Sequence, residues 1–482
     1  MKEAYLIIDI GTGNVRVALA NVSGKVITVE RDNVHYTIDK LYPAAISFDP
    51  DELWSQIISL TKKVLQNNPG VAIKAITASS QREGIVLLGH DGTSLTGLPN
   101  HDHRGREWEN TIPDNDKDIV YQLAGRYPTS LFSALKITGL KNKHPELYEK
   151  IATMVSISDW AQYKLSGVTG YEHSQASETL LYDVAQKRWS KKLCSIFSIN
   201  ENILPELRLS GTVLGKILPE YADQLSISPE AVIVVGGADT QLAIKSTQPS
   251  VEDIVLVSGT TTPVVKIINE YTVDKNQRTW TNRHVESDTF ILETNAGVTG
   301  LNYQRLKEVF YPNEGYEVIE KELAELAGSP QCVASLGSLI ADEKSPLTKG
   351  GFIFDAPVSD QLTRASFVWA ALWDIACCIK ENFDSLCDVT PYRQDYVWAC
   401  GGGLQSAILR QFIASLINKK IKLREGYKQA SVVGGALICN QTFGNNEHAD
   451  TGVEIIEPKD IEQYVSFYKE WKKVRSGFRQ IF

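Results

Sequence analysis

The chain has 482 residues, of which 43% are hydrophobic and 22% charged, and a formal net charge of -9 at neutral pH. These proportions are typical of a globular protein, and the length predicts two domains of roughly 200 to 250 residues each. A pI near 5.5 argues against nucleic acid and an anionic membrane surface as partners. An anionic ligand would therefore have to be held by local amides, a few basic groups or a metal.

The N-terminal sequence MKEAYLIID contains the acidic Glu3 and too short an apolar run for a signal peptide. The longest apolar helix candidate, residues 366–379, contains Asp374, so we expect no membrane span. The seven cysteines are scattered without a CxxC pair of the kind that binds zinc. We interpret them as reduced core thiols of a cytoplasmic protein.

Residues 4–30 read as a strand that ends near Asp9, a Gly-Thr-Gly turn and a second strand. Arg16 stands where a dinucleotide-binding motif would need a third glycine, and the Gly-Lys pairs at 24–25 and 215–216 are not followed by Ser or Thr, as a P-loop requires. What remains is a hairpin whose turn can wrap a phosphate, with Asp9 placed where a metal-bound water could sit. An ordinary hairpin with a polar turn is the alternative.

The rest of the chain alternates between short strand-like runs and helical segments. This alternation predicts an α/β fold. Strands are predicted at 75–81, 84–89, 231–237, 289–294 and 396–403, and helices at 51–66, 144–153, 364–386 and 404–417.

The segment 231–243 runs from a buried strand through two glycines to Asp239 and then into a helix. This places the Asp239 carboxylate at the C-terminal end of a strand, where open α/β sheets bind ligands. Its alternative role is the N-cap of the following helix. Polar residues and Pro249 at 245–250 mark the domain boundary, which gives domains 1–245 and 246–482.

Residues 253–270 again read strand, Gly-Thr turn, strand, and aligning the two turns gives an offset of 248 residues. Because this is about half the chain, it favours a duplicated fold with one phosphate hairpin in each half. Val257 falls opposite Asp9, so the turns are similar in shape but not in chemistry. Further on, residues 396–406 end a strand in three glycines, where backbone can lie against a nucleotide or form a plain tight turn.

Eight segments that follow one another along the chain are DIGTGNVRVAL, SSQREGIVLL, NHDHRG, ISDWAQYKLSG, VVGGADTQLA, VLVSGTTT, ACGGGLQS and ASVVGGALI. In this order they resemble the FGGY family of carbohydrate kinases over essentially the whole chain. The resemblance implies two duplicated actin- and hexokinase-like (ribonuclease H-like) domains with a catalytic cleft between them. Within the family, REGIVLL, ISDW and DTQLA are most similar to autoinducer-2 kinases, with xylulose kinases next.

The resemblance implies ATP and Mg²⁺, with a small sugar or a hydroxyketone such as dihydroxypentanedione phosphorylated at a terminal hydroxyl. Asp9 would position Mg²⁺ through water, and Asp239 would accept the proton of the attacking hydroxyl. Substrate contacts would come from Arg82, Glu83, Asp102, Asp239 and Gln241. The residues implied for ATP are Gly11, Thr12, Gly13, Asn14, Ser258, Gly259, Thr260, Thr261, Gly401, Gly402 and Gly403.

The sequence departs from the family pattern in three places. DEKSP at 342–346 stands where Glu-Arg-Thr-Pro is common, the long helix lacks the usual Glu-Gly, and Thr240 separates Asp239 from Gln241. The first two departures bear on the contact between the domains.

Several alternatives stay open. Arg82 and Glu83 could form a surface salt bridge, and 101–106 could be a solvated turn. The chain could be a xylulose or other pentulose or polyol kinase, an actin-like or chaperone ATPase, or a catalytically idle member that binds nucleotide or sugar as a scaffold. The presence of both Asp9 and Asp239 favours an enzyme. His101 and His103 lack a third ligand, and the oligomeric state stays open, a homodimer included.

Overall fold

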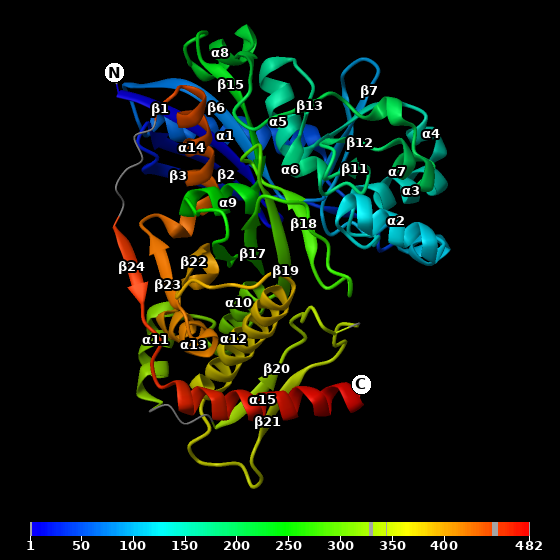
Figure 1. Ribbon diagram of the computed structural model, residues 1–482. Coiled ribbons are helices and arrows are strands. Elements are labelled where there is room, and N and C mark those ends of the chain that lie inside the picture. Colours follow the sequence, from blue (N-terminus) through cyan, green and yellow to red (C-terminus); the bar gives the residue numbers. More distant parts are fainter. Residues whose placement is uncertain (1, 327–330, 344, 446–451, 482) are drawn as a thin grey trace.

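The computed structural model describes residues 2–326, 331–343, 345–445 and 452–481. Two large mixed sheets dominate it, one in the upper and one in the lower part of Figure 1. The N-terminal sheet consists, in spatial order, of β14 (Val213–Lys216), β15 (Val232–Ala238), β6 (Val71–Ser80), β1 (Lys2–Ile10), β2 (Asn14–Asn21) and β3 (Val26–Asn33). The C-terminal sheet consists of β18 (Trp280–Arg283), β19 (Phe290–Val298), β17 (Thr261–Ile268), β16 (Ile254–Val257), β22 (Tyr396–Cys400), β23 (Lys420–Arg424) and β24 (Val453–Ile456).

The two sheets repeat one topology. In each, a central strand pairs antiparallel with the strand that follows it in the chain, β1 with β2 and β16 with β17. On its other side the central strand pairs parallel with a later strand, β1 with β6 and β16 with β22. A further parallel strand, β15 or β23, comes next. The predicted duplication and α/β class are therefore confirmed.

Smaller sheets and the helices surround these two. The third sheet has the order β8 (Ser94–Leu98), β7 (Ile85–Gly89), β9 (Ile151–Ser156), and four strand pairs are β4 (Thr37–Ile38) with β5 (Ile46–Ser47), β10 (Tyr171–Glu172) with β13 (Leu207–Arg208), β11 (Tyr182–Asp183) with β12 (Arg188–Trp189) and β20 (Cys332–Ser335) with β21 (Gly351–Phe354). The helices are α1 (Pro50–Gln66), α2 (Asp114–Ala124), α3 (Ser133–Lys143), α4 (Pro145–Tyr148), α5 (Ile157–Ser166), α6 (His173–Ala176), α7 (Lys191–Ile196), α8 (Pro219–Leu225), α9 (Asp239–Thr247), α10 (Gly300–Phe310), α11 (Tyr316–Glu325), α12 (Arg364–Val389), α13 (Ala407–Ile417), α14 (Ala430–Thr442) and α15 (Ile461–Ile481).

Two helices, α9 and α14, connect the sheets; in Figure 1, α9 lies near the middle of the molecule and α14 lies above it, beside the N-terminal sheet. Ala243 and Ile244 of α9 belong to a buried cluster with strands of the C-terminal sheet, whereas Val432 and Ala436 of α14 belong to one with strands of the N-terminal sheet. The helices touch closely, because a Cβ on Gly434 would lie 1.9 Å from the backbone oxygen of Leu242. The division at residue 245 stays a prediction. Helix α14 follows residue 245 in the sequence but packs against the N-terminal sheet.

Strands β18 and β19 form an arm that reaches from the C-terminal sheet to the N-terminal half. The Tyr121 hydroxyl donates to the backbone oxygen of Thr279 at 2.8 Å. The Thr281 amide donates to the Gly125 oxygen at 3.0 Å, and the Arg283 amide to Ser177 Oγ at 3.0 Å. The arm is thus tied to the N-terminal half by its backbone.

Most predicted elements exist, including the helices now seen as α1, α12 and α13. The helix predicted at 144–153 is wrong beyond its first turn, since α4 ends at Tyr148 and 151–156 form β9. The β-branched residues of β9 pair with β7, a strand far earlier in the chain. This long-range pairing overrides the local helical pattern.

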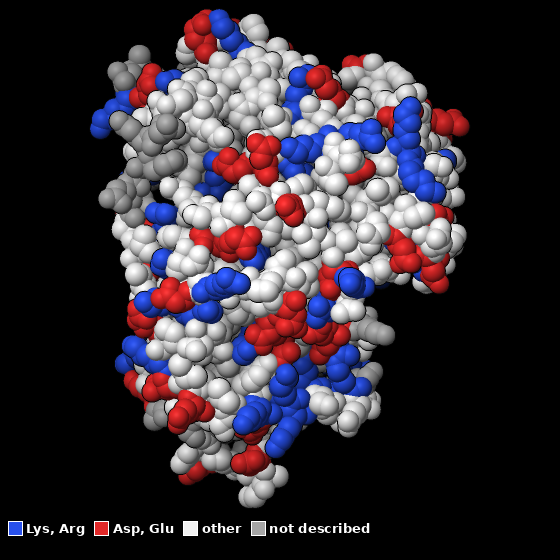
Figure 2. All heavy atoms as spheres, in the orientation of Figure 1, with Lys and Arg blue, Asp and Glu red and all other residues white. Residues whose placement is uncertain are grey.

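All seven cysteines are free thiols, as predicted. Within the described ranges, none of the helices is both long and apolar enough to cross a membrane. Acidic and basic side chains lie interspersed over the face shown in Figure 2.

Candidate active site

Asp9, the second-last residue of strand β1, is 1% exposed and accepts hydrogen bonds from several elements. Ser79 Oγ of β6 donates to Asp9 Oδ1 at 2.6 Å, and Ser431 Oγ of α14 donates to Oδ2 at 2.9 Å. Arg16 of β2 contacts the same Oδ2 and donates to Gln429 Oε1 at 3.0 Å. Both carboxylate oxygens are therefore engaged by the protein. Sequence reasoning missed Ser79, Ser431 and Arg16 as partners of Asp9.

The turn after Asp9 is closed by a hydrogen bond from the Gly11 amide to the Asn14 oxygen at 2.9 Å. Thr12 faces the protein, because its Oγ1 accepts from Asn100 Nδ2 at 2.9 Å. Gly13 is exposed, and a Cβ built on it would have nothing within 4 Å. The turn therefore leaves backbone open on one side for a ligand.

The second turn, Ser258 to Thr261, is packed against the predicted nucleoside glycines. The Gly403 amide donates to the Ser258 oxygen at 2.8 Å. Gly401 has φ +100°, and a Cβ there would lie 2.2 Å from the same oxygen. Only glycine fits at 401, whereas Gly402 has open space around it. The structure thus brings together two of the three segments for which ATP contacts were predicted, 258–261 and 401–403.

Asp239 begins α9 and is partly buried. The N-cap is Ala238, and the Asp239 carboxylate accepts from the amide and hydroxyl of the adjacent Thr240, at 2.6 and 3.2 Å, rather than from the amides of the next turn. The capping alternative is therefore wrong. Burial, together with the nearby charge of Asp9, raises the pKa of Asp239 to about 6, while Arg82 opposes the shift. A carboxylate so placed is suited to accept a proton near neutral pH.

Arg82 and Glu83 lie in the interior, 7% and 6% exposed, so the surface salt-bridge alternative is wrong. Arg82 donates to both carboxylate oxygens of Glu293, at 2.6 and 3.0 Å. Glu293 belongs to β19, so this bidentate pair connects the two halves of the chain. Although burial opposes it, the neighbouring carboxylates of Glu293, Glu178 and Glu83 raise the pKa of Arg82. Arg82 is a permanent cation beside Asp239.

Asp102 is wholly buried, with Oδ1 accepting from the Ile46 amide at 2.9 Å and Oδ2 from Arg104 Nε at 2.7 Å. The solvated-turn alternative for 101–106 is wrong, since Arg104 is also buried. Buried Lys136 donates to the Asn100 and Asp102 oxygens at 2.8 and 2.7 Å. The Asp102 segment is thus fixed to the first turn through Asn100.

Gln241, another predicted substrate contact, is wholly buried on α9. Among the described residues, neither its amide nitrogen nor its amide oxygen has a hydrogen-bond partner. The structure places it two residues after Asp239 but away from solvent.

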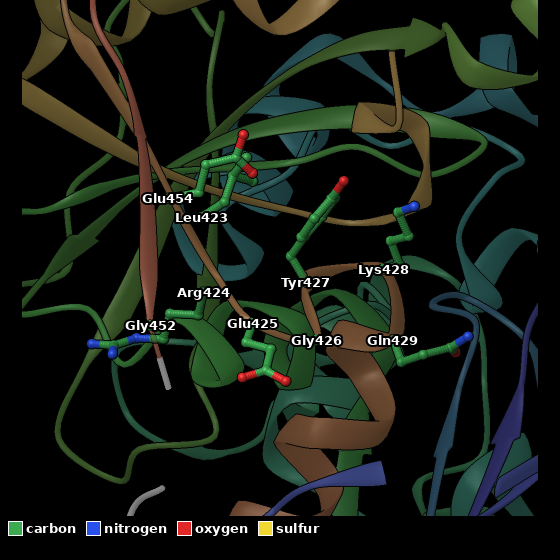
Figure 3. Close-up of a pocket in the computed structure, with 9 residues that line it drawn as sticks. All are labelled: Leu423, Arg424, Glu425, Gly426, Tyr427, Lys428, Gln429, Gly452 and Glu454. Carbon is green, nitrogen blue, oxygen red and sulfur yellow. The ribbon is translucent and has the colours of Figure 1, made fainter. Parts of the chain in front are cut away.

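A pocket of about 410 Å³ lies beside β23, β24 and the segment 425–429 (Figure 3). Its Gln429 contacts Arg16, and its Tyr427 accepts the Gly401 amide through the backbone oxygen at 2.8 Å. None of the predicted site residues lines it. The lining residues are Leu423, Arg424, Glu425, Gly426, Tyr427, Lys428, Gln429, Gly452 and Glu454.

The family models for the two domains of the FGGY carbohydrate kinases match residues 4–245 (N-terminal domain) and 301–442 (C-terminal domain). The chain belongs to the FGGY family of carbohydrate kinases. This FGGY kinase is 51% identical over 478 residues, 99% of its length and 98% of the relative's, to the Bacillus subtilis (strain 168) protein named "Putative sugar kinase YoaC". It is 23% identical over 98% of its length and 94% of the relative's to the autoinducer-2 kinase of Salmonella paratyphi A (strain ATCC 9150 / SARB42).

Solved structures agree on the fold. Ligand-bound xylulose kinase from Lactobacillus acidophilus superposes with a TM-score of 0.85 at 18% identity, covering 99% of this chain and 98% of that one. Plasmodium falciparum glycerol kinase with ADP gives a TM-score of 0.85 at 21% identity, with the same coverage. The two-domain, actin- and hexokinase-like fold is thereby confirmed. The chain is a sugar kinase, and kinases of this family use ATP.

Proposed function

We propose that this FGGY kinase transfers the γ-phosphoryl group of ATP to a terminal hydroxyl of a linear five-carbon hydroxyketone. The single observation that carries the proposal is the position of Asp239. Its carboxylate is partly buried beside Asp9, caps no helix, and has a pKa raised to about 6. Such a group can be ionised at neutral pH and still accept a proton in the transition state.

The proposed reaction is a direct displacement. The acceptor oxygen forms a bond to the γ-phosphorus as its proton passes to an Asp239 carboxylate oxygen, and the bond from phosphorus to the bridging oxygen breaks to release ADP. No covalent intermediate with the protein is required, because positioning and charge neutralisation supply most of the catalysis. Arg82 and Glu83 would bind the acceptor hydroxyls next to Asp239.

The two hairpin turns would hold the ATP phosphates through backbone amides. The openness around Gly13 and Gly259, where an added Cβ would meet nothing within 4 Å, supports close approach of a ligand. Gly401 to Gly403 would lie against the nucleoside. Arg16, which sequence reasoning left out of the site, adds positive charge between Asp9 and Gln429.

The residues around Asp9 fit a hydrated Mg²⁺. Both carboxylate oxygens already accept hydrogen bonds from serines, so water-mediated rather than direct coordination suits the site, and Mg²⁺ retains several waters in proteins. When bound, Mg²⁺ would neutralise charge on the ATP phosphates. Asp9 would orient the metal's water shell, and Ser79 and Ser431 would orient Asp9.

The acceptor class rests on the resemblance of residues 82–88, 157–160 and 239–243 to autoinducer-2 kinases, and on the 23% identity to such an enzyme. Xylulose is the second candidate because the xylulose kinase pattern is the next most similar.

A panel of acceptors tests the proposal. ADP release is measured for the purified chain with ketoses, alditols, aldonates and dihydroxypentanedione. The expected result is the highest kcat/KM for dihydroxypentanedione or xylulose. A preference for glycerol or an aldonate far above both would overturn the assignment of acceptor class.

A further inference from the structure

A chain of alternating charges extends inward from Arg82. Glu293 Oε2 lies 2.6 Å from Arg82 Nη1, and Glu178 Oε1 lies 3.7 Å from the same nitrogen. Glu178 Oε2 is in turn 2.5 Å from Arg126 Nη2. The four side chains come from β19 and from the segments that follow β6, α6 and α2. Two of the other three thus contact Arg82, the side chain that is proposed to bind the acceptor, and Arg126 contacts Glu178.

The inner pair, Arg126 and Glu178, is wholly buried. Within the part of the chain that the structure describes, the charged atoms of both side chains contact each other without well-aligned hydrogen bonds. The Arg126 guanidinium lies over two rings, 5.1 Å from the centroid of Phe132 and 4.7 Å from that of Trp280. Burial lowers the pKa of Arg126 and raises that of Glu178. The two rings, of which Trp280 belongs to β18, therefore fix the Arg126 guanidinium next to Glu178.

Stability alone does not account for this pair. Removing two charges from water costs free energy that their attraction rarely recovers in full, and hydrophobic side chains of similar volume often serve as well or better. The pair does, however, act on Arg82. Glu293 attracts both Nη atoms of Arg82 toward the arm, while Glu178 attracts Nη1 from the N-terminal half. Together the two carboxylates fix the direction in which the guanidinium points.

We propose that Glu178, held by Arg126, is a positioning residue for acceptor binding: it sets the orientation of the Arg82 guanidinium beside Asp239. This inference rests on the proposed function, in which Arg82 binds acceptor hydroxyls. A polar pocket selects its ligand through the pairing of individual hydroxyls, so a rotated guanidinium would weaken acceptor binding and leave ATP binding intact. Glu178 touches neither ligand in this account.

The test compares three variants with the wild type, using the best acceptor from the panel. Glu178→Gln keeps the shape and removes the charge. Because it leaves Arg126 unpaired, the double variant Arg126→Met, Glu178→Leu removes both charges and keeps the volume apolar. Asp374→Asn is the matched control, since Asp374 is also a wholly buried carboxylate, with Trp471 Nε1 donating to it at 2.7 Å in the C-terminal half.

We expect both Glu178 variants to raise the acceptor KM by roughly ten- to a hundredfold, the range for a displaced binding group, with the ATP KM within about twofold of wild type. Asp374→Asn should change neither KM. An unchanged acceptor KM in the folded double variant, or a parallel rise of both KM values, would overturn the role of Glu178.

Acceptor binding is also measured by calorimetry without ATP, which separates this inference from the proposed function. A wild-type chain that binds an acceptor but never phosphorylates it would overturn the proposed function, while a weaker binding constant in the Glu178 variants would still support the positioning role. A wild-type chain that binds none of the panel would overturn both.

Discussion

The hairpins β1–β2 and β16–β17 have the same place in their sheets and different chemistry. Asp9 of the first is held by serines of β6 and α14 and by Arg16. At the matching position of the second stands Val257, buried among apolar side chains that include Ala243 and Ile244 of α9. Duplication has thus kept two glycine turns that can approach phosphates, while the carboxylate assigned to the metal exists in one copy only.

The largest effect is expected for Asp239→Asn. The proton of a primary hydroxyl needs a base as the bond to phosphorus forms, so turnover should fall by roughly 10² to 10⁴-fold. Asn has the same shape, and nucleotide affinity should be retained. The control is Asp253→Asn, a buried aspartate of the C-terminal half to which the Tyr396 hydroxyl donates at 2.9 Å. Steady-state ADP release decides: retention of more than about a tenth of wild-type turnover by Asp239→Asn would disprove the base assignment.

The next prediction tests whether the two hairpins differ in their need for a carboxylate. Asp9→Asn should reduce turnover at low Mg²⁺, and added Mg²⁺ should restore part of it, because the carboxylate acts through the metal. Moving the carboxylate to the other copy, in Asp9→Asn with Val257→Asp, should not restore activity.

Val257→Asp alone should destabilise the fold by about 3 kcal/mol or more, since Val257 is buried in an apolar cluster whereas serines donate to Asp9. Thermal unfolding and a Mg²⁺ titration of ADP release measure these effects. Recovery of activity in the double variant would mean that the two hairpins are interchangeable.

Gly401 and Gly402 allow a comparison of two adjacent alanine substitutions in the C-terminal half. Gly401→Ala should lower stability and weaken ATP use, because its φ is +100° and the added Cβ would lie 2.2 Å from the Ser258 oxygen. Gly402→Ala adds a methyl group to open space and should leave the melting temperature unchanged. Equal melting temperatures for the two variants would contradict the close packing of this segment on the second turn.

The smallest effect is a pH dependence. Only ionised Asp239 can accept the proton, so kcat/KM should fall by about tenfold per pH unit below a pKa of about 6. The folded-state pKa is above the ordinary value of 3.8, so folding takes up a proton between about pH 4 and pH 6. The stability that this group contributes is therefore fully present below about pH 4 and is lost as pH rises through about 6. Asp239→Asn should therefore melt at or above the wild-type temperature at pH 7.5. A lower melting temperature would show that ionised Asp239 supports the fold.

The sequence predicted features that depend on local pattern. The glycine turns, the long apolar α12 and Asp239 directly after β15 all follow from residues close together in the chain, and the repeat follows from comparing two such local patterns. It did not predict that Arg82 is buried against Glu293 and near Glu178, since those partners lie 211 and 96 positions away. Ser431, which donates to Asp9, is 422 positions away. Charges that pair only after the halves fold together leave no local pattern.

The same limit explains the error at 144–153, where strand pairing across the third sheet determined the structure. Alternatives such as the surface salt bridge at Arg82 failed for a related reason. A charged pair in a sequence reads as solvated unless its buried partners are known.

The most direct test of the account is ATP consumption coupled to acceptor phosphorylation by the wild-type chain. ADP release is followed enzymatically and the product by ³¹P nuclear magnetic resonance, with xylulose and dihydroxypentanedione as acceptors. The account predicts ADP and a terminal phosphate monoester in equal amounts, with ester formation by Asp239→Asn slowed by roughly a hundredfold or more. ATP binding without acceptor-dependent ADP release, for every sugar tested, would contradict it and identify the chain as a catalytically idle member of its family.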